Sequence, residues 1–102
     1  MDIHIDAAGT ARLDGAEDFT SLRLRGIAPA AGGRSTLAAA GIELADDASH
    51  AFVEPAAFAR LAGAIATQPA WQDGFARMVA YASDHGWTDA AGRIRAHAEW
   101  DV

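Results

Sequence analysis

Four side chains recur at every fourth position between residues 73 and 85, a spacing that places them in one row along a helix. They are Asp73, Arg77, Tyr81 and His85. A phenol and an imidazole at the margin of an apolar face can serve as acid and base, because imidazole titrates near neutrality. The alternative is an ordinary surface row, in which Asp73 and Arg77 form an ion pair and the Tyr81 hydroxyl stays in water.

A second group of candidates consists of arginines on one face of a predicted sheet. Alternation along the predicted strands places them there together: Arg12, Arg23, Arg25, Arg93 and Arg95. Planar guanidinium groups suit a carboxylate or a phosphate, so this face predicts a site for a small anionic ligand. The alternative is a solvated face of cross-strand ion pairs. The acidic partners in that case would be Asp2, Asp6, Glu99 and Asp101.

The histidines give no metal-binding signature. They are His4, His50, His85 and His97, and no two of them form an H-x-H or H-x-x-x-H pair. His4 and His97 would meet only if the first and last strands pair. The acidic turns near residues 14–18 and 46–47 lack the spacing of an EF-hand, and no phosphate-binding or dinucleotide-binding glycine motif occurs. We therefore expect neither a metal site nor a cofactor.

Composition narrows the possible classes of function. The chain has 102 residues, a formal net charge of −6 and no Cys, so disulfides and thiolate chemistry are excluded. All its basic residues are Arg, and the absence of Lys removes Schiff-base chemistry. The negative charge argues against nucleic acid and anionic membranes as partners. With no signal-peptide pattern and no apolar run of about 20 residues, we expect a cytoplasmic protein without a membrane span.

Two amphipathic helices are predicted between residues 54 and 86, and the second would carry the row formed by Asp73, Arg77, Tyr81 and His85. Pro55 and Pro69 suit first helical positions, and large apolar residues recur behind each at helical spacing. Small residues lie beside these faces, and we expect them to let the two helices pack closely, with Gly63 at the contact. Gly86 predicts a left-handed cap at the end of the second helix, covered by Trp87.

The remaining elements are predicted to be strands. Apolar and polar residues alternate most strictly over residues 94–102, where Arg93, Arg95 and His97 share one face. A hairpin is expected from the first two strands, and residues 28–34 are expected to form a mobile loop before a short helical turn at 36–40. The predicted strands cover residues 2–6, 10–14, 19–26, 42–44, 50–53 and 94–102.

Together these patterns predict one α+β domain over residues 1–102. It would contain a single antiparallel or mixed sheet of about five to six strands, with two amphipathic helices packed on one face. The last strand raises a further expectation. Because nothing follows it to cover an exposed edge, it would either pair with the first strand or support a homo-oligomer.

Two classes of function remain open. We favour a small non-enzymatic module, an oligomerising or accessory subunit that binds a protein partner or a small anionic ligand, because no catalytic signature occurs. The alternative is a cofactor-independent isomerase, dehydratase or hydrolase with an acid–base site between helices and sheet. Its catalytic candidates are Tyr81, His85 and His97. The ligand-binding candidates are Arg77, Arg93, Arg95, Arg23 and Arg25.

Overall fold

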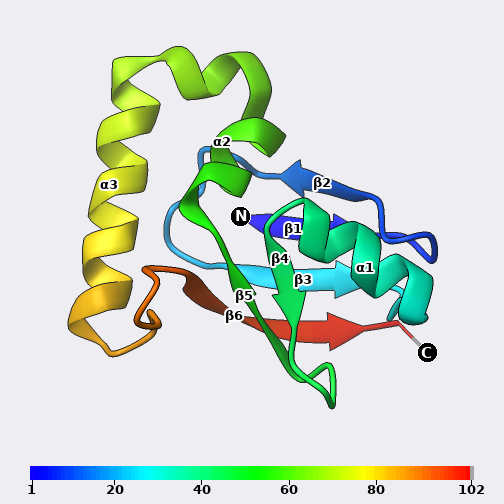
Figure 1. Ribbon diagram of the computed structural model, residues 1–102. Helices are drawn as coiled ribbons and strands as arrows, with labels where there is room; N and C mark the ends of the chain where they lie inside the picture. Colours follow the sequence, from blue (N-terminus) through cyan, green and yellow to red (C-terminus); the bar gives the residue numbers. More distant parts are fainter. Residues whose placement is uncertain (102) are drawn as a thin grey trace.

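The computed structural model describes residues 1–101, which form six strands, three α-helices and one 3-10 helix (Figure 1). The strands are β1 (Asp2–Ile5), β2 (Ala11–Asp14), β3 (Arg23–Gly26), β4 (Ile42–Leu44), β5 (His50–Val53) and β6 (Ile94–Trp100). The helices are α1 (Ala31–Ala39), α2 (Pro55–Ala62), the 3-10 helix η1 (Gly63–Thr67) and α3 (Pro69–Asp84). Across these residues, the helices are all too short or too polar to cross a membrane.

All six strands belong to one mixed sheet in the order β2-β1-β3-β6-β5-β4. The central strands β1, β3 and β6 run parallel, while β2 pairs antiparallel with β1 and the β4–β5 hairpin pairs antiparallel with β6. Figure 1 shows β4 and β5 crossing the view steeply while β1 and β3 run across it, so the sheet is strongly twisted. The predicted α+β class and mixed sheet are confirmed, with three α-helices in place of two.

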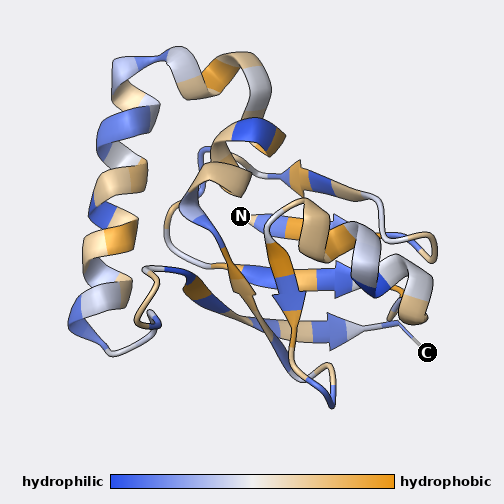
Figure 2. Cartoon of the chain, viewed as in Figure 1, coloured by the Kyte–Doolittle hydropathy of each residue, from blue (hydrophilic) through white to orange (hydrophobic). Residues whose placement is uncertain are grey.

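One face of the sheet is apolar and carries the helices. Alternate residues of the strands point to this face, as the alternating colours of the strands in Figure 2 reflect. Leu37 of α1, Phe58 of α2 and Trp71 of α3 are buried in the same core as the strand residues. The core strand residues include Ile3, Ile5, Leu24, Val53, Ile94, Ala96 and Ala98. Burial of each large apolar side chain contributes roughly 1.5–3 kcal/mol.

Aromatic rings join the helices to one another. The rings of Trp71 and Phe75 stack in parallel with centroids 4.9 Å apart, and Phe75 lies 5.3 Å from Phe58 of α2. The indole N–H of Trp71 donates a hydrogen bond to the Ala16 carbonyl at 2.8 Å. This bond satisfies the only polar atom of the Trp71 side chain and ties α3 to the loop after β2.

The expected mobile loop at residues 28–34 is wrong, because α1 begins within it at Ala31. The small residues there serve a close approach between two segments. A Cβ atom added to Gly33 would lie 2.6 Å from the Pro29 side chain and 3.2 Å from the Gly9 nitrogen. The alanines around this contact favour a helix, and Leu37 anchors it in the core.

The expected contact between helices at Gly63 is also wrong. α2 ends at Ala62, and Gly63 has φ +66° and ψ −132°, a conformation that a side chain strongly disfavours. A Cβ atom on Gly63 would have no neighbour within 4 Å. This glycine therefore turns the chain from α2 into η1, and the phenylalanine rings supply the contact between α2 and α3.

The predicted cap at Gly86 is confirmed. Gly86 has φ +73°, its N–H bonds to the Ser83 carbonyl at 3.1 Å, and the Trp87 N–H bonds to the Ala82 carbonyl at 2.8 Å. These two bonds define a Schellman motif. Trp87 packs beside the helix end against His85 and stays 45% exposed.

The strand that was expected to lie at an edge is at the centre. β6 pairs with β3 on one side and β5 on the other, so it does not pair with β1 and offers no free edge for self-association. The expected meeting of His4 with His97 is wrong for the same reason, since β3 separates their strands. The edges of the sheet are the short strands β2 and β4.

A pair of glycine substitutions tests the interpretation of Gly63. Gly63→Ala should lower the free energy of unfolding by about 1–3 kcal/mol, because the backbone there is strained for any other residue. Gly32→Ala should raise it by roughly 0.4–1 kcal/mol, since Gly32 lies in α1 and an added Cβ is equally free of neighbours. Urea unfolding of both variants measures the difference, and equal effects would contradict it.

The cap at Gly86 yields a second prediction. Gly86→Val should lower the free energy of unfolding by about 1–3 kcal/mol, because a β-branched residue is poorly tolerated at positive φ. Thermal unfolding against the wild-type chain measures the loss. Gly86→Asn serves as the control, because Asn adopts this conformation more readily, and a loss as large as that of valine would count against the cap.

Candidate functional site

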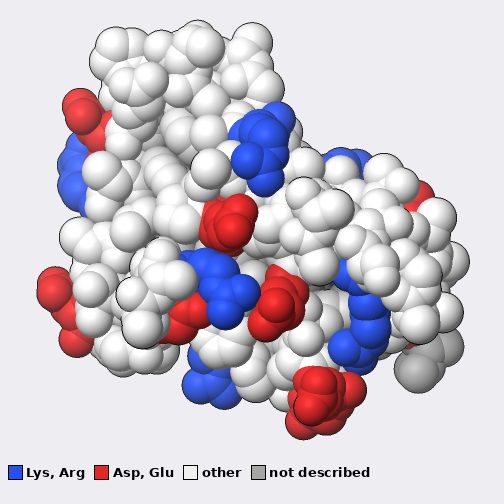
Figure 3. Space-filling view, in the orientation of Figure 1, with Lys and Arg blue, Asp and Glu red and all other residues white. Residues whose placement is uncertain are grey.

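The polar face of the sheet carries rows of ionisable side chains across the strands. One row follows the register Asp2–Arg23–His97–His50, from β1 through β3 and β6 to β5. Arg12, Arg25 and Arg95 also lie on strands with their side chains exposed. The predicted arginine face is therefore present, on the side of the sheet away from the helices. On the helix-covered side, Figure 3 shows basic and acidic residues interspersed without a continuous patch of one sign.

Two of the predicted ligand-binding arginines are paired with acids. The Arg23 guanidinium contacts Asp2 and Glu99, each at 3.1 Å, and Arg25 lies 3.6 Å from the second Asp2 oxygen. The hydrogen bond to Asp2, with the negative charges around it, raises the pKa of Arg23. Their charges are thus balanced within the protein, which matches the cross-strand ion pairs considered from the sequence. Asp2 fills this role opposite Arg23.

Arg93 is fixed by the turn before β6. Its Nε donates to Asp89 at 2.7 Å, its Nη1 lies 3.6 Å from Glu43, and its guanidinium lies 5.3 Å from the Phe52 ring centroid. The hydrogen bond to Asp89 raises the pKa of Arg93. Partial burial opposes ionisation of Asp89, but the bonds from the Arg93 backbone and side chain outweigh it and lower the pKa of that carboxyl. Arg93 therefore holds the turn in place.

Arg77 lies apart from the sheet on α3. Its Nε donates to the Asp73 carbonyl at 3.3 Å, and the part of the chain that the structure describes shows no ion pair between the two side chains. Arg77 borders a shallow surface hollow together with Tyr81 and Phe19. This position is separate from the arginines of the sheet, so the predicted ligand-binding residues do not form one cluster.

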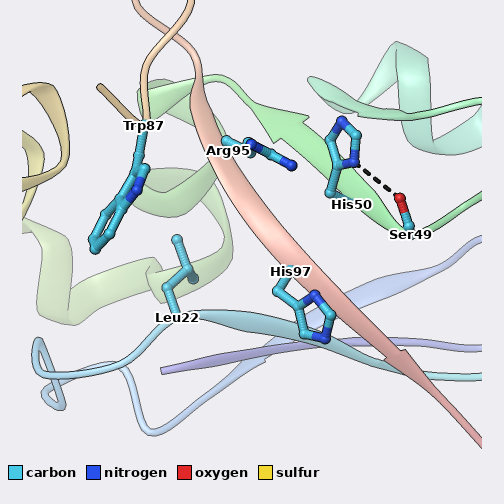
Figure 4. Close-up of a pocket in the computed structure, with 6 residues that line it drawn as sticks. All are labelled: Leu22, Ser49, His50, Trp87, Arg95 and His97. Atoms are coloured by element: carbon cyan, nitrogen blue, oxygen red, sulfur yellow. Dashed lines mark hydrogen bonds between the residues drawn. The ribbon is translucent and has the colours of Figure 1, made fainter. Parts of the chain in front are cut away.

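Arg95 on β6 also borders a hollow, one on the polar face of the sheet. The hollow has a volume of about 400 Å³ and is lined by Leu22, Ser49, His50, Trp87, Arg95 and His97 (Figure 4). Within residues 1–101, the Arg95 guanidinium makes no ion pair. The imidazoles of His50 and His97 are direct cross-strand neighbours beside it. Among the described residues, the hollow thus gathers one guanidinium without an ion pair and two imidazoles.

A chain of hydrogen bonds fixes the tautomer of His50. The Ser49 hydroxyl donates to Asp47 Oδ1 at 2.7 Å, and its oxygen lies 3.0 Å from His50 Nδ1 (Figure 4). Because the single hydroxyl proton is directed at Asp47, the Ser49 oxygen must accept a proton from Nδ1. His50 Nε2 of the neutral ring is then an acceptor. The order Asp–Ser–His differs from a hydrolase triad, in which the imidazole accepts the serine proton.

Trp87 links this hollow to the aromatic side chains at the end of α3. Tyr81 and His85 stack with ring centroids 4.0 Å apart, and Trp87 lies 4.9 Å from His85 and 5.8 Å from Tyr81. His85 Nδ1 donates to the Tyr81 carbonyl at 2.8 Å, because a carbonyl can only accept. A second, adjoining hollow is bordered by Tyr81 and shares Leu22, Trp87 and Arg95 with the first.

The catalytic candidates are only partly brought together. Tyr81 and His85 are in contact, whereas His97 lies in the hollow on the polar face with Trp87 between. His97 points away from the helix-covered face, whereas Tyr81 and Arg95 border the adjoining hollow between α3 and β6. Sequence reasoning passed over Ser49, His50 and Trp87 as site residues. The Asp-x-Ser-His pattern ahead of a short strand is the signal that could have indicated His50.

Comparison with known proteins gives no relative to extend these observations. No protein-family model matches the chain, and neither a curated protein nor a solved structure is similar to it. Within the described residues, no group of three or more His, Asp or Glu side chains is arranged to hold a metal ion. The candidate site is therefore defined by the geometry of this chain alone.

The lowered carboxyl pKa values predict acid sensitivity. Hydrogen bonds from Thr20 lower the pKa of Asp18, and those from Ser49 lower the pKa of Asp47, each from an ordinary value of 3.8. The unfolded chain therefore takes up protons first as the pH falls. The free energy of unfolding should be constant above about pH 5 and should decrease as the pH falls through 4 and below.

Urea unfolding between pH 7 and pH 3 measures this dependence. Asp47→Asn should reduce the decrease, because the amide oxygen can still accept bonds from Ser49 but has no charge to lose. Asp73→Asn is the control, since the Asp73 carboxylate accepts no hydrogen bond from any described residue. An identical pH dependence in all three chains would contradict the role given to Asp47.

Proposed function

We propose that the chain is a small non-enzymatic binding module that takes an anionic ligand in the hollow between Trp87 and the paired histidines. The single observation that carries this proposal is the Arg95 guanidinium, which forms no ion pair with residues 1–101 and lies beside His50 and His97. In a chain with a net charge of −6, this site concentrates basic groups on a surface that is hollowed. Carboxylates and phosphates are the anions that such groups bind best.

Each basic group has a separate part in this proposal. Arg95 offers a planar pair of donors to two oxygens of the anion. His97 can add a ring N–H donor, while the Nδ1–H of His50 is already directed at Ser49. Two acids of neighbouring segments already have partners within the protein, since Glu99 pairs with Arg23 and Asp47 accepts the Ser49 hydroxyl. A bound anion therefore meets little competition from the protein.

One observation favours the enzymatic alternative. Ser49 fixes His50 with Nε2 as an acceptor, which is the state a general base requires. A cofactor-independent isomerase, dehydratase or hydrolase would use His50 with His97 in this way. The binding module remains our first choice, because the Ser49 hydroxyl in the hollow donates to the Asp47 carboxylate and not to an imidazole base, and Tyr81 lies outside the hollow.

As a second part of the proposal, the surface beside the hollow would bind a protein partner or a second copy of this chain. The exposed rings of Tyr81 and Trp87 beside the hollow are the apolar surface that such a partner would cover. The sheet edges are less suited, because β2 and β4 contain only four and three residues.

A charge-matched pair of variants tests the anion site. Arg95→Ala should weaken binding of acetate or inorganic phosphate roughly tenfold, because one charged hydrogen-bonding group is removed. Arg12→Ala removes the same charge from the polar face but at the β2 edge, where Arg12 already pairs with Asp14. It should leave the affinity unchanged.

Chemical-shift titration of the backbone amides measures both affinities. Amides of β5 and β6 around the hollow should move in the wild-type chain. Equal affinities in the two variants, or no saturable shift with either anion, would count against the proposed site.

A further inference from the structure

Building on the proposed anion site, we infer that its ligand is a planar aromatic carboxylate, with the ring against Trp87 and the carboxylate at Arg95. Trp87 and Arg95 line the same hollow, with Leu22 as a further apolar wall (Figure 4). Leu22, Trp87 and Arg95 also border the adjoining hollow. The Arg95 side chain extends toward His50 in Figure 4, so the ligand would reach across the hollow from the indole to the guanidinium.

Trp87 and Arg95 are held in a fixed relation by the backbone. The Arg95 N–H donates to the Trp87 carbonyl at 2.7 Å, and Thr88 forms an antiparallel bridge with Ile94. The cap at Gly86 fixes the other side of Trp87 through the bond from its N–H to Ala82. The backbone positions of Trp87 and Arg95 are thus set relative to each other before any ligand arrives, which reduces the ordering that binding requires.

The indole is supported on one side and open on another. His85 and Tyr81 pack against it, yet Trp87 remains 45% exposed. A tryptophan buries a large area when it is covered, so leaving it open forgoes stabilisation that a ligand ring would recover. The exposure of Trp87 does not result from a mobile chain end, because the backbone on both sides of it is hydrogen-bonded.

The protein itself does not use this ring to hold a cation. Among residues 1–101, the cation–π contact is that of Arg93 over Phe52, and Arg95 is not stacked on Trp87. Arg95 therefore remains available for an anion while the indole remains available for a ring. A volume of about 400 Å³ lies in the range of small-molecule sites.

The test compares three carboxylates on the wild-type chain: acetate, cyclohexanecarboxylate and benzoate. Cyclohexanecarboxylate matches benzoate in size and charge but lacks the π face. Benzoate should bind roughly two- to tenfold more tightly than cyclohexanecarboxylate, as expected for a stacked aromatic pair. Amide chemical-shift titration gives the affinities, and the amides of Trp87 and Arg95 should be among those that move.

Two variants test whether the aromatic ring of Trp87 causes the preference for benzoate. Trp87→Leu should abolish the preference for benzoate while keeping an apolar wall, and Trp87→Phe should retain it. The wild-type comparison decides the inference even if Trp87→Leu fails to fold. Equal affinities for benzoate and cyclohexanecarboxylate would overturn the aromatic inference and leave the anion site standing. No saturable binding of any of the three carboxylates would overturn the anion site itself.

Discussion

The rest of the structure depends on the insertion of β6 between β3 and β5. Without β6, the sheet would consist of two separate parts, β2-β1-β3 and β5-β4, each with an unpaired edge and half of an apolar face. The ion pair between Arg23 and Glu99 spans 76 positions in sequence, which shows how distant the joined segments are. The entropy of closing such loops must be overcome before the core forms, so folding should be dominated by non-local contacts.

The same strand builds both the core and the candidate site. Ile94, Ala96 and Ala98 face the helices, while Arg95 and His97 face the hollow. A slip of one residue in pairing would exchange these two sets and place a guanidinium in the core. The cost of that exchange fixes the register. The position of Arg95 is therefore secured by the burial of its neighbours, and not by contacts of its own side chain.

Local pattern predicted the faces of the strands but not their order. Period-two alternation placed Arg23, Arg25 and Arg95 on the polar face because the side-chain direction is a property of each strand alone. Which strand lies beside β6 depends on distant segments. Pairing of β6 with β1 was therefore a reasonable expectation, but β3 lies between the two strands. Glycine was ambiguous for a related reason. Gly86 and Gly63 both adopt positive φ, but only Gly86 was followed by the residues that indicate a helix cap.

The charges around the candidate site depend on the pairing register of the strands, which the sequence pattern did not predict. Arg23 and Arg25 face acids because β1 places Asp2 beside β3 and β6 places Glu99 opposite Arg25. Arg95 instead faces Phe52 of β5, a strand without acidic residues. Within residues 1–101 no ion pair balances its charge, and the next pair along the strands, His97 with His50, adds no negative charge. The proposed anion would balance the charge of Arg95 at this end of the sheet.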